Sequence, residues 1–391
     1  MKAFLICAAA LTVVTAEPCS ADAQHATAQP IEAQSPTAQP AAAQDIPPSP
    51  AAVPECNCRE HFDWVKSTFE ENDAGFGYVL EKKGQAAYDL HNALALEKVD
   101  AANTHGDCRQ ALQEWLRFFR RGHIALGYLS PTAKLEPDRN APPTAEQLAE
   151  RASRFFVEKI NETTLYMRIP SFMRWAKPII DSVVDRNREL ILSTENLIID
   201  LRGNGGGADY SWDELTPFLY TNPVRNLRVE FLSTPLNNEY WAKVRIDKED
   251  DEDSWSRRIL DSLEANPGKF YNPWGEKATV SRQDTVHRYP ANVGVIVDEM
   301  CGSSTEEFLL HARQSMKVKL FGVQTYGALD ISNVTEVDSP DGLYRLVYAT
   351  SRALWLPDMV IDDIGIQPDF YLGDMPREDW RDYTSDILNA R

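Results

Sequence analysis

The chain has 391 residues, of which 43% are hydrophobic and 25% are charged, a mixture that is usual for folded globular proteins. Its formal net charge of −19 argues against nucleic acid and anionic membrane surfaces as partners, because both bind basic surfaces. The length allows one large domain or two ordinary domains with a sizeable core.

The N-terminus has the features of an export signal. Residues 1–23 begin with Lys2, continue with an apolar stretch and end in small residues, which predicts a cleaved signal peptide and a periplasmic or secreted protein. Cys19 lacks the leucine and small-residue context of a lipid anchor, so we do not expect lipidation. Residues 24–55 are dominated by Ala, Gln and Pro and predict a disordered tether. No other stretch approaches the ~20 apolar residues of a membrane span.

Residues 56–130 have apolar side chains at helical spacing and predict a small N-terminal helical domain, followed by a strand that begins near Arg121. In an oxidising compartment Cys108 is expected to pair with either Cys56 or Cys58. The chain has no C-x-x-C motif and its histidines are scattered, so no metal or other cofactor is predicted.

Residues 131–155 predict a connector, and residues 156–391 predict an α/β core in which strands alternate with helices. An insertion at 223–290 carries an acidic run and many aromatic residues, which either line a cleft or pack the insertion itself. Strands are expected at Leu165–Ile169, Asn196–Leu201, Val293–Val297 and Val318–Val323, helices at Trp175–Leu192 and Trp212–Tyr220, and a hairpin around Asp341-Gly342.

The stretch after the Val293–Val297 strand combines a tight turn with the start of a helix. Ser303 and Ser304 should lie at the helix N-terminus, where free backbone N–H groups would stabilise an oxyanion formed by an attacking serine. The same residues also fit a capping box, Ser303 with Glu306 or Ser304 with Glu307, and such a box needs no chemistry.

A glycine cluster, Gly203 to Gly207, follows the strand that ends at Leu201. It lacks the patterns of phosphate-binding loops, but glycines let backbone N–H groups approach a ligand closely, as an oxyanion hole requires. His123 is one of seven histidines, and a lone histidine is usually structural.

Together these segments resemble the tail-specific, or C-terminal processing, serine peptidase family, which includes the tricorn core peptidases. The resemblance implies a ClpP/crotonase-like α/β spiral with Ser303 as nucleophile and Ser304 as its adjacent rival. It also implies oxyanion donors at the amides of Gly206, with Gly205 as the alternative, and of Ser304. The segments that carry it are NLIIDLRGNGGG (196–207), VIVDEMCGSSTEEF (295–308), LFGVQTYGALDISN (320–333) and IDDIGIQPDF (361–370).

The chain departs from this family in two places. Many members use a lysine from a Thr-Phe-Gly-Lys segment, but here that position is Ala328; the tricorn-like branch instead uses a histidine and an acidic residue, which map to His123 and Asp362. Where tricorn has a serine before its histidine, this chain has Gly122. The segment before Leu165 is also too short for the family's PDZ domain, so substrate recognition is expected from the helical domain and the insertion.

These observations predict an exported serine endopeptidase that cleaves peptides or unfolded proteins through an acyl-enzyme. Ser303 would attack, His123 would carry the proton, Asp362 would orient His123, and the amides of Gly206 and Ser304 would hold the oxyanion. The alternatives are an inactive binding or scaffold protein on the same fold and a hydrolase of non-peptide acyl groups. No oligomeric state is predicted.

Overall fold

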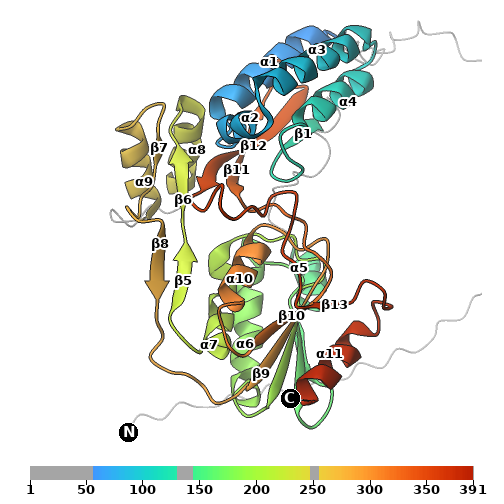
Figure 1. The fold of residues 1–391 in the computed structure, drawn as a ribbon, viewed down its shortest axis with the longest axis vertical. Coiled ribbons are helices and arrows are strands. Elements are labelled where there is room, and N and C mark those ends of the chain that lie inside the picture. Colours follow the sequence, from blue (N-terminus) through green and yellow to red (C-terminus); the bar gives the residue numbers. More distant parts are fainter. Residues whose placement is uncertain (1–55, 130–143, 247–254, 391) are drawn as a thin grey trace, which may run out of the picture. The chain divides into compact units, whose positions relative to one another are not determined.

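The computed structural model describes residues 56–129, 144–246 and 255–390 (Figure 1). The predicted signal peptide and tether, most of the connector and the acidic run at 249–253 lie outside the described residues. Within the described part of the chain, no helix is both long and apolar enough to span a membrane.

Four helices form the N-terminal region, and they share a core with strands from the opposite end of the chain. Buried rings of Phe69, Trp115 and Phe119 pack between the helices, and Cys58 forms a disulfide with Cys108 while Cys56 remains free. The core also includes side chains of two strands, β1 and β12. The elements are α1 (Cys58–Asn72), α2 (Phe76–Lys83), α3 (Gln85–Ala101), α4 (His105–Leu116), β1 (Ala125–Tyr128) and β12 (Tyr344–Ala353).

A six-stranded sheet forms the centre of the second region, with the order β13-β10-β9-β4-β3-β2, and only β2 is antiparallel to its neighbour. Its strands are β2 (Phe156–Lys159), β3 (Thr164–Arg168), β4 (Asn196–Asp200), β9 (Asn292–Val297), β10 (Val318–Gly322) and β13 (Phe370–Tyr371).

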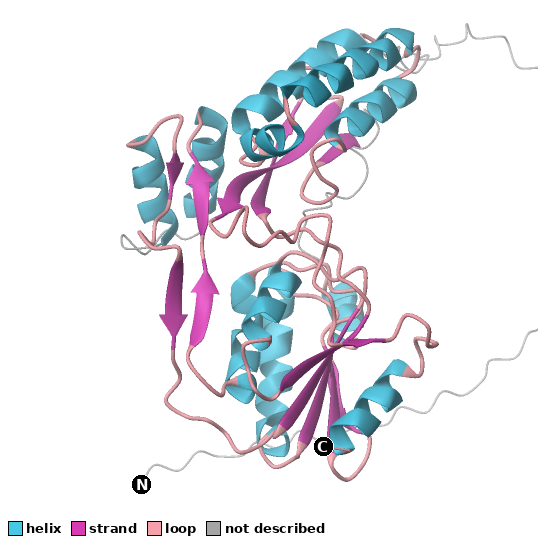
Figure 2. Cartoon of the chain, in the orientation of Figure 1, coloured by secondary structure: helices cyan, strands magenta, loops and turns pink. Residues whose placement is uncertain are grey.

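Helices cover both faces of this sheet (Figure 2). On β4, Leu197 and Ile199 face the core shared with α6 (Lys177–Ile191) and α10 (Ser304–Ala312), whereas Ile198 faces α11 (Trp380–Asn389). A strand buried on both faces reads as a continuous apolar run, which is why the sequence predicted it. The predicted α/β class is confirmed.

The 223–290 insertion has a small core of its own, in which Phe231 and Trp241 pack against α9. A second sheet joins this insertion to the predicted hairpin, which is present as β11 and β12. The remaining elements are α5 (Ala145–Ala152), β5 (Val224–Leu227), β6 (Val229–Leu232), α8 (Pro235–Ile246), α9 (Trp255–Glu264), β7 (Phe270–Tyr271), β8 (Ala278–Ser281) and β11 (Ile331–Asp338).

Two local predictions differ from the structure. The helix expected over Trp212–Tyr220 is a 3₁₀ helix, Asp209–Leu215, followed by the short α7, Thr216–Leu219. The strand expected from Arg121 begins only at Ala125, because His123 has a φ of +57°, which extended strand geometry does not allow.

Candidate active site

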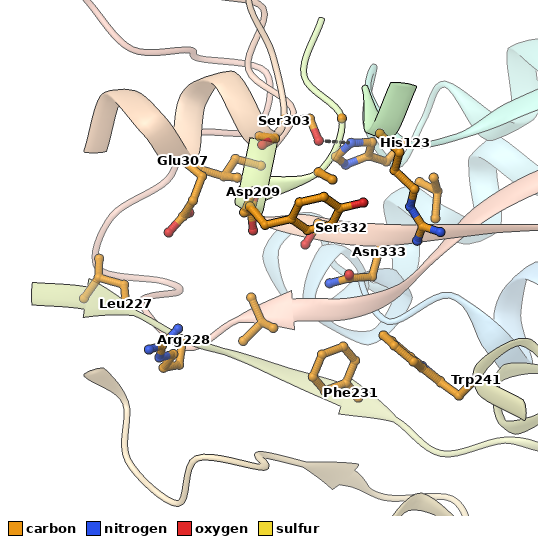
Figure 3. Close-up of a pocket in the computed structure, with 18 of the residues that line it drawn as sticks. His123, Asp209, Leu227, Arg228, Phe231, Trp241, Ser303, Glu307, Ser332 and Asn333 are labelled. Atoms are coloured by element: carbon orange, nitrogen blue, oxygen red, sulfur yellow. Dashed lines mark hydrogen bonds between the residues drawn. The ribbon is translucent and has the colours of Figure 1, made fainter. Parts of the chain in front are cut away.

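Ser303 lies at the N-terminus of α10, directly after the turn that leaves β9. Its φ of +57° is rare for a residue with a side chain and is typical of strained turns that expose a nucleophile. The carboxylate of Glu306 accepts the backbone N–H of Ser303 at 3.2 Å, as in a capping box. The hydroxyl of Ser303 lies 3.1 Å from Nε2 of His123 (Figure 3). Capping geometry and a nucleophile–base contact therefore coexist in one residue.

The tautomer of His123 follows from its second contact. Nδ1 lies 2.6 Å from the carbonyl oxygen of Ile331, and because a carbonyl can only accept, Nδ1 carries the proton. Nε2 is then free to accept the hydroxyl proton of Ser303. Burial, with the positive charge of Arg120, lowers the pKa of His123 to about 4, so the ring is neutral at pH 7.

Asp362 does not hold the place that the sequence predicted. Instead of contacting His123, its carboxylate accepts the backbone N–H groups of Leu329 at 2.7 Å, Asp330 at 2.8 Å and Ile331 at 3.3 Å. Burial and the charge of Asp330 raise the pKa of Asp362 to about 7. The predicted direct contact is replaced by an indirect one, in which Asp362 holds the segment whose carbonyl binds the histidine.

A buried ion pair between Arg120 and Asp73 lies next to the backbone of His123. Arg120 donates to Asp73 through both terminal nitrogens, at 2.8 and 2.6 Å, and one of these nitrogens also lies 3.4 Å from the carbonyl oxygen of His123. Asp73 also accepts the backbone N–H of Ala349 in β12 at 3.1 Å. The sequence carried no signal for this pair, because its members lie 47 residues apart in the loops that follow two different helices.

Ala328 stands where many family members have a lysine, and the space around it is occupied by backbone. The carboxylate of Glu306 accepts the N–H groups of Gly327 and Ala328, each at 2.8 Å. A Cβ atom placed on Gly122 would lie only 2.3 Å from Cβ of Ala328, so the segment that delivers His123 passes directly over residue 328. A lysine side chain at 328 would compete with that segment for the same space.

The oxyanion donor predicted at Gly206 is not available in the structure. The N–H of Gly206 donates to Oδ1 of Asn204 at 3.0 Å and is therefore occupied. The backbone N–H of Phe172 donates to the carbonyl of Gly206, and the carbonyl of Phe172 accepts the N–H of Ala208. In this parallel bridge the N–H of Gly207, the residue between them, points away from Phe172. Within the described residues the amides of Gly207 and Ser304 make no hydrogen bond, and both residues line the same cavity.

The surroundings of Ser304, the predicted rival, and of Cys301 do not favour either residue as a nucleophile. The Ser304 side chain is buried, and its hydroxyl accepts a hydrogen bond from the indole of Trp212 at 3.3 Å rather than meeting His123. Cys301 is fully buried, and burial raises the pKa of its thiol well above 9, so it stays protonated.

A cavity of about 450 Å³ opens beside Ser303 and His123 (Figure 3). Its far walls come from the insertion, so the aromatic residues of 223–290 both pack that insertion and line a cleft. Across the described ranges, no group of three or more His, Cys, Asp or Glu side chains could hold a metal ion. Besides the residues already described, the lining includes Arg174, Asp209, Arg228, Val229, Phe231, Tyr240, Trp241, Trp274, Glu307 and Asn333.

Comparisons with known proteins found a matching family model and similar solved structures. The model of peptidase family S41 matches residues 163–372. The structure of mature CPAF complexed with lactacystin superposes with a TM-score of 0.59 at 12% identity, over 85% of this chain and 98% of that one. A candidate peptidase from Parabacteroides merdae ATCC 43184 gives 0.53 at 14% identity, over 85% and 97% of the two chains. Among curated proteins, none matches the sequence.

Proposed function

The chain belongs to peptidase family S41 and is a serine peptidase, and we propose that it is an exported endopeptidase that works through an acyl-enzyme. The observation that carries the mechanism is the 3.1 Å contact between Oγ of Ser303 and Nε2 of His123, in a ring whose other nitrogen is already a donor.

The proposed reaction begins when Oγ of Ser303 attacks the carbonyl carbon of the scissile peptide bond while Nε2 of His123 takes the hydroxyl proton. The negative charge that develops on the carbonyl oxygen is bound by the amides of Ser304 and Gly207. His123 then gives the proton to the leaving nitrogen as the C–N bond breaks, which leaves an ester on Ser303. Water attacks this ester with the same histidine as base and restores the free serine.

In this proposal Asp362 is a positioning residue. It holds the Leu329–Ile331 backbone, and the Ile331 carbonyl in turn keeps the tautomer of His123 and stabilises the positive charge that the ring acquires during the reaction. A carbonyl dipole stabilises the protonated ring less strongly than a carboxylate charge would, but the carbonyl group does not change its charge with pH.

The export proposal is supported by residues 1–23 and by the Cys58–Cys108 disulfide, since disulfides form and persist in oxidising compartments. A peptide or an unfolded protein is the substrate that this activity requires. Fractionation of producing cells, with the mature N-terminus read by mass spectrometry, tests the export step.

A serine-directed fluorophosphonate, combined with a casein hydrolysis assay, tests the mechanism. We expect labelling and hydrolysis in the wild-type protein and loss of both in Ser303→Ala, while Ser304→Ala still reacts. Labelling that survives Ser303→Ala would reject the assigned nucleophile. A folded protein with neither labelling nor hydrolysis would favour a binding or scaffold role, and hydrolysis of esters alone would favour a non-peptide acyl hydrolase.

A further inference from the structure

The cavity beside Ser303 has two carboxyl groups on its wall that the proposed reaction does not use. Glu307 lies four residues after Ser303, its backbone N–H donates to the carbonyl of Ser303 at 3.1 Å, and both residues line the cavity. Asp209 follows the glycine cluster at 203–207 and accepts a hydrogen bond from the side chain of Ser304. Figure 3 shows both carboxylates on the Ser303 side of the cavity, with Arg228 across from them.

These carboxyl groups lack a cationic partner. Within the described residues the carboxyl group of Glu307 makes no hydrogen bond, and no basic side chain forms an ion pair with either carboxyl group. Burial and the charge of Asp209 raise the pKa of Glu307 to about 8, although Arg228 opposes the shift. Asp209 is exposed to solvent on the wall of the cavity. With a pKa of about 8, Glu307 is largely protonated at pH 7, and a cation bound beside it would favour the ionised carboxylate.

Arg228 is held by other contacts. Its guanidinium lies over the ring of Trp274, 4.9 Å from the centroid, and one terminal nitrogen donates to the hydroxyl of Thr279. These contacts hold the guanidinium within the insertion, while its Nε has no hydrogen-bond partner among the described residues.

The cluster also has room around it. Asp209, Arg228 and Glu307 line a second cavity of about 380 Å³ as well as the first one, so they lie where the two cavities adjoin. A long side chain that enters next to Ser303 can pass the apolar wall and bring its end group to the carboxylates without displacing the main chain.

We propose that this cavity binds the lysine or arginine side chain of a substrate residue next to the scissile bond, with Asp209 and Glu307 as the groups that select it. The stem of such a side chain packs against apolar surface such as Val229 and Phe231, and its cationic end pairs with Asp209 and with Glu307, whose ionised form the cation favours. The inference deepens the proposed peptidase function and rests on it.

The test uses three quenched fluorescent peptides that differ at one position beside the cleaved bond, with lysine, the uncharged norleucine or glutamate. In the wild-type protein we expect kcat/KM for the lysine peptide to exceed that for norleucine at least tenfold. This ratio should fall toward one in Asp209→Asn and in Glu307→Gln, each checked for folding by circular dichroism. Glu276→Gln, an exposed carboxylate change in the same insertion, should leave the ratio unchanged.

Equal hydrolysis of the lysine and norleucine peptides, or a preference for glutamate, would overturn the inference and would leave the peptidase function standing. If no peptide were cleaved and no fluorophosphonate label entered, the peptidase proposal would fail instead. Binding of the same peptides to Ser303→Ala then tests whether the cavity selects a cationic side chain. Binding of the lysine peptide at least tenfold tighter than that of the norleucine peptide supports this selection, and equal binding rejects it.

Discussion

Nδ1 of His123 lies 2.6 Å from the carbonyl oxygen of Ile331, and this backbone contact takes the place where a Ser–His–Asp site has a carboxylate. A neutral acceptor holds the tautomer without placing a negative charge beside the ring. The protonated ring is therefore less stabilised, which agrees with the low pKa of His123.

The first prediction concerns the acid limb of the pH profile. Since burial lowers the pKa of His123 to about 4, the ring stays neutral as the pH falls from 7 and becomes protonated only near pH 4. We expect kcat/KM, which reports the free enzyme, to lose its histidine-dependent activity only near pH 4 rather than near 6.5. Initial rates at low substrate concentration measure this. A half-maximal point at pH 6 to 7 that belongs to the histidine would contradict the assigned environment.

The second prediction concerns Asp362→Asn. An amide offers one acceptor oxygen where the carboxylate has two, so the Leu329–Ile331 backbone and the Ile331 carbonyl should shift. We expect kcat to fall about 10- to 100-fold, as for other residues that orient a catalytic group. The variant Asp358→Asn, on an exposed turn of the same region, serves as control and should keep wild-type kcat.

The same variant has an expected effect on stability. Asp362 has a folded-state pKa of about 7, above its ordinary value of 3.8, so the folded state binds more protons between these pH values. Its contribution to the free energy of unfolding is therefore fully present below pH 3.8 and is lost as the pH rises through 7. Urea titrations at pH 5 and pH 7.5 should show a stability loss for Asp362→Asn that is larger at pH 5. A loss that is larger at pH 7.5 would refute this.

The third prediction concerns the close approach of Gly122 to Ala328, the position where many family members have a lysine. Gly122→Ala places a Cβ atom 2.3 Å from Cβ of Ala328 and should cost about 1–3 kcal/mol of stability as well as misplacing His123. Adding Ala328→Gly should restore part of the activity, because it removes the atom that is struck. If the double variant had no more activity than Gly122→Ala alone, the contact with Ala328 would not be the cause of the lost activity.

The fourth prediction concerns Gly206→Ala. A Cβ atom there would lie 2.9 Å from Cβ of Ser303 and 2.9 Å from the nitrogen of Ser304, so the nucleophile and one oxyanion donor would both be displaced. We expect kcat to fall at least 100-fold, of the order found when an oxyanion donor is lost. Gly203→Ala is the matched control, because a Cβ atom at Gly203 meets open space. Equal loss in both variants would point to general damage of the loop.

The fifth prediction concerns the Cys58–Cys108 disulfide. Cys108→Ser should lower the free energy of unfolding by about 2–4 kcal/mol, since the loop closed by the bond is long. In the denatured, unreduced mature protein, alkylation should modify Cys56 and Cys301 and leave Cys58 and Cys108 unmodified. Mass spectrometry of the fragments measures this, and alkylation of Cys108 without reductant would show that the bond is absent.

The sequence alone determined the α/β class and the place of Ser303, the proposed nucleophile. Strands β4 and β9 are buried on both faces, so they appear as continuous apolar runs, and each ends in a loop of small residues at the same edge of a parallel sheet. Such patterns are local, and Ser303, Ser304 and the glycine loop could therefore be found without coordinates. The family resemblance then singled out His123 from seven histidines.

Only the tertiary structure decided what holds His123 and what faces the substrate. Every residue has a carbonyl and nearly every residue an N–H, so the acceptor at Ile331 and the free amide at Gly207 have no signature in the sequence. The Arg120–Asp73 pair and the Asp209–Glu307 cluster join side chains that are far apart along the chain. Folding brings the members of each group together, and around the Arg120–Asp73 pair it also removes water.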